Sequence, residues 1–188
     1  DVWVFCTKHP YLITGIIICL TAYISYEKTF SFNFWRDDWS ILYRLKYDFR
    51  FFVKYAIKNR HPGELINYLP WIFWYDTNFF PWAVHGLILK VLASISIGLA
   101  TKALVRSRKA GIIAAILFSS YFGGLEAFSW MSARLSAHLI IFIALTFYFY
   151  AVSYSAYSKK FFLALVCMFT IVMLEPGRAV FLPPLLLL

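Results

Sequence analysis

Residues 79–101 have the sequence FFPWAVHGLILKVLASISIGLAT, in which Lys90 is the single charged side chain. A helix rises about 1.5 Å per residue, so a segment of this length can cross the roughly 30 Å hydrocarbon core of a bilayer. The rest of the chain agrees with this, because 62% of its 188 residues are hydrophobic and 14% are charged, against about 25% charged in soluble domains. The sequence therefore predicts an integral membrane protein and excludes a water-soluble globule.

Further apolar runs lie on both sides of this segment. We expect membrane spans at residues 11–26, 79–101, 110–122, 135–157 and 161–174, and the start of a sixth at 179–188. The run at 110–122 is shorter than the roughly 20 residues of a span, so we expect it to continue into a bent or re-entrant turn at Gly123 and Gly124. The predicted fold class is all-α, a polytopic transmembrane bundle of five or six spans in one domain over residues 1–188, the N-terminal part of a longer chain.

The distribution of basic residues predicts the orientation of this bundle. If the crossings alternate, the two short loops on one face hold six basic residues and no acid, namely Lys102, Arg106, Arg108, Lys109, Lys159 and Lys160. The short loops on the other face hold one arginine each, Arg134 and Arg178. By the positive-inside rule the first face is cytoplasmic. The net charge of +9 then reflects orientation in the membrane, and we do not expect a nucleic-acid partner.

The acidic residues gather on the opposite face. Of the nine acids, Asp1 alone falls on the cytoplasmic side, and the others are Glu27, Asp37, Asp38, Asp48, Glu64, Asp76, Glu126 and Glu175. We therefore expect a multi-pass protein of a plasma, inner or ER-type membrane whose acidic loops, and any carboxylate chemistry, are extracytoplasmic.

The first outer loop, residues 27–78, contains an amphipathic pattern. Apolar residues recur at steps of three and four, at Leu42, Leu45, Phe49, Phe52 and Ala56, while basic residues recur every four, at Lys46, Arg50, Lys54 and Lys58. This pattern predicts a helix lying in the membrane interface. Its basic stripe would face lipid phosphates, either for anchoring alone or to hold the phosphate head of a lipid-linked substrate.

Two adjacent carboxylates, Asp37 and Asp38, lie between aromatic residues just beyond the first span. Desolvation there raises the pKa of a carboxylate and a neighbouring cation lowers it, so one of the pair is a candidate general base. Oxygen ligands of this kind also suit a divalent cation, although two acids alone do not make a metal site. The simpler interpretation is a helix N-cap ahead of Trp39, which the pair taken alone favours.

Charged residues at the mouths of later spans are further candidates for substrate binding. Glu126, Trp130 and Arg134 are spaced by four, so one helical turn would bring the acid and the arginine together across the tryptophan. Glu175 and Arg178 repeat this arrangement at the end of the fifth span. Ion pairing without function is the alternative for both pairs, although charges at a span mouth are functional candidates by default.

Two histidines lie inside predicted spans, His85 and His138. Such residues can ligate haem or chlorophyll, but a single histidine in a membrane helix more often hydrogen-bonds a neighbouring helix. Lys90 is expected to extend toward the interface or to face the bundle interior. The sequence contains no Cys-x-x-Cys pair, phosphate-binding glycine loop or nucleophile elbow, and we assign no metal ligand.

The order of these features resembles the GT-C superfamily of polytopic glycosyltransferases, which includes the protein O-mannosyltransferases. The matching stretches are Asp37-Asp38-Trp39, Arg60-x-Pro62, residues 118–134 (FSSYFGGLEAFSWMSAR) and residues 173–188 (MLEPGRAVFLPPLLLL). His61 is an insertion relative to the Arg-Pro commonly found in the family. Family members also have several hundred residues and more spans.

The resemblance implies an activity and roles for individual residues. A sugar would pass, with inversion, from a polyprenyl- or dolichyl-phosphate donor to an extracytoplasmic acceptor. Asp37 or Asp38 would deprotonate the acceptor hydroxyl or bind a divalent cation, and Arg60 and Arg134 would hold the donor phosphate, since a guanidinium suits phosphate oxygens. The expected partners are membrane lipids and the lipid-linked sugar donor.

An alternative from another class is a non-catalytic membrane subunit of a larger complex, with a pigment or haem bound through His85 or His138. A transporter fragment is less favoured, because transporters place acids at mid-membrane, where this chain has mainly Lys90.

Overall fold

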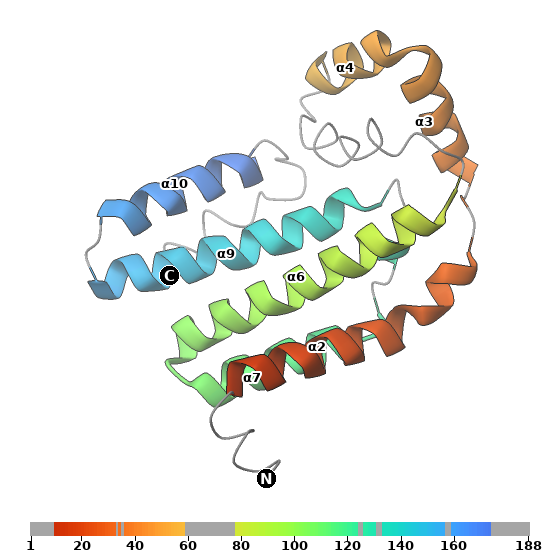
Figure 1. Ribbon diagram of the computed structural model, residues 1–188. Helices are drawn as coiled ribbons and strands as arrows, with labels where there is room; N and C mark the ends of the chain where they lie inside the picture. The colour runs from red at the N-terminus through yellow and green to blue at the C-terminus, as the bar shows by residue number, and fades with distance from the viewer. Residues whose placement is uncertain are drawn as a thin grey trace.

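The computed structural model describes residues 10–32, 34, 36–58, 78–123, 126–130, 133–156 and 159–173. Within these ranges the chain is helical and contains no strand. The predicted all-α class is therefore confirmed for the described residues. Figure 1 shows α10, α9, α6 and α2 lying side by side, with α7 behind α2, and with α3 and α4 at one end of the bundle.

Among the described residues, three helices are long and apolar enough to cross a membrane. These are α2 (Pro10–Tyr26), which continues into the 3-10 turn η1 (Glu27–Ser31), α6 (Phe80–Val105) and α9 (Leu135–Ala156). Each falls on a predicted span, with its ends within a few residues of those expected. The apolar runs determine where these helices lie along the chain. A helix satisfies its backbone polar groups internally, so an apolar segment can lie in lipid as a helix.

Two further helices coincide with predicted spans but are shorter. They are α7 (Arg108–Ser120), with 13 residues, and α10 (Lys159–Met173), with 15. The third run is thus as short as its sequence indicated, and α7 ends in extended backbone at Tyr121, ahead of a turn at Gly123. The number of membrane crossings stays a prediction, and the sixth span lies outside the described residues.

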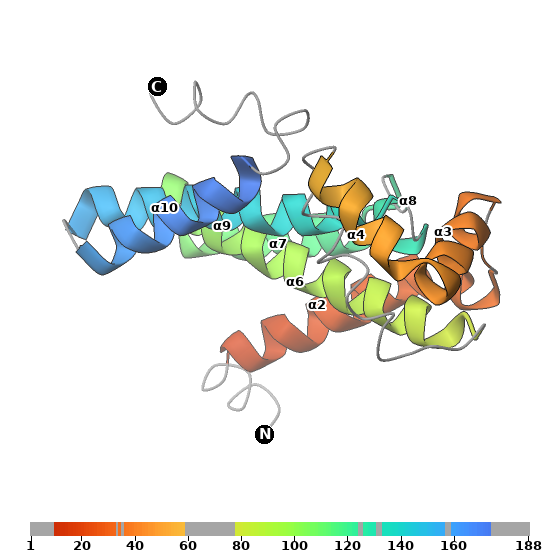
Figure 2. The same ribbon diagram turned by 90° about the horizontal axis from the view of Figure 1, so that it is seen from above.

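The central helix of the bundle is α6. It packs against α9 on one side and against α7 and α2 on the other, while α10 packs on the outer side of α9 (Figures 1 and 2). Large apolar side chains remain exposed on the outer helices, including Leu12, Ile16, Leu20 and Ile24 of α2 and Phe162, Leu163 and Val166 of α10. A contiguous apolar surface of this kind suits contact with lipid.

Small and hydroxyl side chains join α2 to α7. Ser25 Oγ donates to the carbonyl oxygen of Ser119 at 2.8 Å, and the hydroxyl oxygens of Thr21 and Ser119 lie 2.5 Å apart. Close packing of small residues, with hydroxyl hydrogen bonds, is how helices associate in membranes.

The connection between α6 and α7 has two residues. Arg106 ends α6 in the left-handed conformation, with a φ of 55°, and Ser107 caps α7 by accepting from the Ala110 N–H at 3.3 Å. The helices then approach so closely that a Cβ on Gly98 or on Gly111 would collide with the backbone of the other glycine. The basic residues flanking the turn are therefore held at one end of the bundle.

Lys90 of α6 faces the bundle interior, one of the two placements expected for it. Its side chain is 1% exposed, and Nζ donates to the carbonyl oxygen of Tyr121 at 3.1 Å. The Tyr121 carbonyl, at the C-terminal end of α7, thereby gains a charged hydrogen-bond donor.

The predicted amphipathic helix of the first outer loop is divided in two. Its parts are α3 (Arg36–Tyr47) and α4 (Phe49–Lys58), and the break falls at Asp48, whose N–H donates to the Arg44 carbonyl at 2.8 Å. The basic residues Lys46, Arg50, Lys54 and Lys58 are exposed as predicted. A location of these helices in the membrane interface stays a prediction.

Candidate functional site

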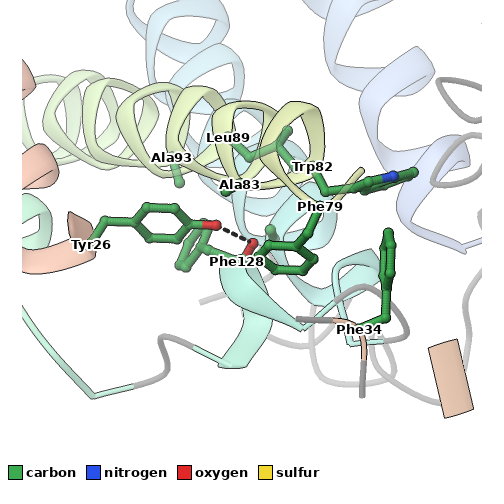
Figure 3. Close-up of a cluster of buried hydrophobic side chains, with 9 residues drawn as sticks. Tyr26, Phe34, Phe79, Trp82, Ala83, Leu89, Ala93 and Phe128 are labelled. Carbon is green, nitrogen blue, oxygen red and sulfur yellow. Dashed lines mark hydrogen bonds between the residues drawn. The ribbon is translucent and has the colours of Figure 1, made fainter. Parts of the chain in front are cut away.

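A cluster of buried aromatic side chains closes the end of the bundle nearest α3. Figure 3 shows Tyr26 from α2, Phe34 from the segment before α3, Phe79 and Trp82 at the start of α6, and Phe128 from the short helix α8 (Glu126–Ser129). The rings of Phe34 and Phe79 meet edge to face, with centroids 5.3 Å apart. Such pairs add about 0.5–1.5 kcal/mol beyond their area burial. The cluster therefore fixes four separate segments at this end.

The carbonyl oxygen of Phe128 accepts three hydrogen bonds. Tyr26 Oη donates at 3.0 Å (dashed in Figure 3), and Arg134 donates from Nε at 3.2 Å and from Nη2 at 3.0 Å. Gly86 makes room for this arrangement, because a Cβ there would collide with the Tyr26 hydroxyl and with the Phe128 carbonyl. These bonds hold α8 against α2 and the start of α9.

Arg134 has no exposed surface. Its guanidinium stacks on the ring of Trp82, 4.8 Å from the centroid, and Nη1 lies 3.4 Å from His85 Nδ1. Burying a charge is costly unless its donors find partners, and stacking on tryptophan offsets part of that cost. Arg134 thus places a fixed positive charge in the wall of this end of the bundle.

The two histidines of the predicted spans, His85 and His138, lie beside Arg134. Their ring centroids are 6.0 Å apart, and His138 Nδ1 lies 3.1 Å from the Arg134 carbonyl oxygen. With these partners His85 Nδ1 is an acceptor and His138 Nδ1 carries a proton. His85 therefore hydrogen-bonds a residue of another element, as is usual for a histidine in a membrane helix.

An open cavity of about 580 Å³ lies at the same end of the bundle. Its described lining consists of Phe32, Phe34, Asp38, Phe79, Glu126, Ser129 and Trp130. The Asp38 side chain is 1% exposed, whereas Glu126 is exposed. The indole Nε1 of Trp130 is buried and has no acceptor among the described residues. The cavity therefore combines aromatic walls with two carboxylates.

Three of the predicted site residues meet on this cavity: Asp38, Glu126 and Trp130. Asp38 is inside α3, two residues after its first described residue Arg36, so the interpretation of Asp38 as an N-cap ahead of Trp39 is wrong. Arg134 lies behind the lining, bonded to the carbonyl that precedes Ser129. The helical turn at Glu126 ends at Ser129, so no continuous helix joins Glu126 to Arg134.

The other predicted site residues cannot be placed. The backbone of Asp37 belongs to α3, but its side chain lies outside the described part of the structure. Arg60, Glu175 and Arg178 also lie outside the described residues.

The sequence did not predict the residues that hold Arg134 in place. Tyr26 and Trp82 resemble the many other aromatic residues near span ends, and a backbone carbonyl such as that of Phe128 has no sequence signature. The one available signal was that an arginine at a span mouth needs acceptors if it is buried.

The cavity lining supplies carboxylate oxygens that can accept hydrogen bonds. A buried carboxylate such as Asp38 is a strong hydrogen-bond acceptor in surroundings of low dielectric constant. The aromatic walls provide flat apolar surfaces of the kind that sugar rings stack on. Among the described residues no three His, Cys, Asp or Glu side chains gather as metal ligands do.

Comparisons of the chain with protein-family models, with curated proteins and with solved structures found no similar family, protein or fold.

Proposed function

We propose that this chain is part of an inverting, GT-C-like glycosyltransferase that uses a lipid-phosphate sugar as donor. The observation that supports this most strongly is the position of Asp38, a carboxylate 1% exposed yet lining an open cavity together with Glu126 and Trp130. A general base must reach the proton that it abstracts while lying in surroundings that keep it reactive. Asp38 lines the cavity from buried surroundings, which supports this role.

The proposed reaction is a direct displacement at the anomeric carbon. Asp38 takes the proton of the acceptor hydroxyl as the acceptor oxygen forms a bond to the anomeric carbon. The bond from that carbon to the phosphate oxygen breaks, and the lipid phosphate leaves with its electron pair. Attack from the face opposite the phosphate inverts the anomeric configuration. Glu126 is the exposed polar group that would orient sugar hydroxyls, and the Trp130 ring would provide an apolar surface beside them.

The arginines have different roles in this proposal. Three nitrogens of Arg134 are engaged with Phe128 and His85, so contact with the donor phosphate would compete with those bonds. Arg134 then acts chiefly by positioning α8 and by its charge. Arg60, Arg178 and the acid Glu175 remain candidates for binding the donor from outside the described residues.

The test is transfer activity in membranes containing the full-length protein. Membranes are supplied with polyprenyl-phosphate mannose, and release of polyprenyl phosphate is measured for Asp38→Asn and Asp37→Asn. Loss of a general base costs about 10²–10⁴-fold in rate, so Asp38→Asn should fall by that factor. Asp48→Asn, an exposed acid at the α3–α4 break, is the matched control. Full activity in Asp38→Asn would rule out Asp38 as the base, and full activity in Asp37→Asn as well would rule out both carboxylates.

A second candidate function is a non-catalytic subunit that binds a haem or pigment. The closeness of the His85 and His138 rings on neighbouring helices favours it. It predicts a Soret or chlorophyll absorption band in the purified protein that disappears in His138→Ala. A colourless protein would eliminate this candidate.

A further inference from the structure

A second cavity lies between α2, α6 and α7, at the end of the bundle opposite Asp38. Its volume is about 210 Å³, and its lining is mostly apolar side chains and glycines, with Lys102 and Arg108 also lining it. It is smaller than the roughly 300–1,000 Å³ of pockets that enclose a whole small molecule. It is therefore suited to part of an elongated ligand, such as one acyl chain.

The two basic side chains are held beside this cavity by Tyr11. The Arg108 guanidinium carbon lies 4.3 Å from the centroid of the Tyr11 ring, and Lys102 Nζ lies 5.8 Å from it. Both basic residues are exposed, so they can meet a ligand from outside. The Tyr11 ring attracts both cations through cation–π interactions, and this offsets part of the repulsion between them.

No carboxylate of the three helices balances these charges. Helices α2, α6 and α7 contain no Asp or Glu, and the sequence has no acid between Asp76 and Glu126. An anionic partner from outside these helices is therefore favoured at this point. Beside exposed apolar helix surfaces, the abundant source of negative charge is the phosphate of a membrane lipid.

The cavity has free space beside α2, where an acyl chain would lie. Gly15 of α2 lines the cavity, and a Cβ built on it meets nothing within 4 Å. On the opposite wall, Gly98 and Gly111 are already in contact across the α6–α7 crossing. The free space therefore lies on the α2 side.

We propose that this cavity binds an anionic glycerophospholipid, with its phosphate between Lys102 and Arg108 and one acyl chain along Gly15. The site is independent of the proposed transferase activity, because it shares no residue with the Asp38 cavity. The predicted orientation places it in the cytoplasmic leaflet, where anionic lipids are concentrated.

The test is lipid binding by the purified full chain in non-ionic detergent, followed by native mass spectrometry. The probes are dioleoyl phosphatidylglycerol, dioleoyl phosphatidylcholine and inorganic phosphate. Phosphatidylglycerol should bind at least tenfold more tightly than phosphatidylcholine, and millimolar phosphate should not displace it. In Lys102→Gln/Arg108→Gln its affinity should fall about 25-fold, roughly fivefold for each charge.

Two further variants separate this site from a general surface charge effect. Lys109→Gln/Lys159→Gln removes the same charge from exposed positions that do not line the cavity, and should leave binding within twofold. Gly15→Leu fills the open space and should weaken phosphatidylglycerol binding at least tenfold while the charges remain. Equal binding of both lipids, displacement by phosphate, an equal loss in the control pair, or unchanged binding in Gly15→Leu would each overturn the proposal.

Discussion

The hydroxyl of Tyr26, at the end of α2, donates a 3.0 Å hydrogen bond to the carbonyl oxygen of Phe128, 102 residues further along the chain. That carbonyl also accepts from Arg134, so one backbone oxygen links α2, α8 and the start of α9. Since α8 supplies Glu126 and Ser129 to the cavity, the geometry of the candidate site depends on this oxygen.

Removing the Tyr26 hydroxyl should weaken the bundle modestly. In Tyr26→Phe the Phe128 carbonyl keeps its bonds to Arg134, so the expected loss is about 1 kcal/mol, the net value of one hydrogen bond. Denaturant unfolding in detergent, followed by tryptophan fluorescence, measures it. Tyr23→Phe, at an exposed tyrosine of the same helix, should change nothing. Equal effects in the two variants would contradict the assigned role.

Gly86→Ala should be more damaging, because its Cβ collides with the Tyr26 hydroxyl and the Phe128 carbonyl. Overpacking of this kind costs about 1–3 kcal/mol, measurable as a lower unfolding midpoint. Adding Tyr26→Phe removes one of the two collisions and should recover part of the loss. Gly15→Ala is the control, since its Cβ meets no atom. If the double variant were less stable than Gly86→Ala, the proposed collision would be wrong.

Arg134→Lys keeps the charge but loses the paired donors to Phe128 and the stacking on Trp82. A lysine is not equivalent at such a site, and the expected loss of stability is about 1–3 kcal/mol. Exposed Arg50 on α4 provides the control, Arg50→Lys, which should be neutral. The temperature of thermal aggregation in detergent measures the stability of the two variants. If Arg134→Lys were as stable as the parent, the positive charge alone would be sufficient at this position.

Lys90 should tolerate an apolar replacement of similar size without a large loss of stability. Replacing a buried charge by an apolar side chain of similar volume is often neutral or stabilising, so Lys90→Met should fold with stability within about 1 kcal/mol of the parent. Lys90→Ala should lose about 2 kcal/mol or more, because it leaves a cavity. The unfolding midpoints of the two Lys90 variants measure these losses of stability. A collapse of Lys90→Met would show that the bond to Tyr121 is essential.

The helices could be predicted from the sequence, whereas the contacts between them could not. Runs such as 79–101 fix where α6 lies, because length and hydropathy suffice for a membrane helix. The break at Asp48 was missed because the apolar and basic stripes continue through it. Asp38, Glu126 and Trp130 were expected at one end of the bundle, and they do share a cavity. The partners of Arg134 depend on a backbone carbonyl and on packing, which no spacing in the sequence encodes.

The two-residue connection between α6 and α7 has a consequence for biogenesis. A 13-residue helix gains too little from the bilayer to partition into it alone, but α7 is tied to a 26-residue neighbour by Arg106 and Ser107. In the predicted topology the two helices enter the membrane together as a helical hairpin, with the long helix providing the driving force for the short one. A flexible insert in this connection would then separate the two insertion events and make insertion of α7 less efficient.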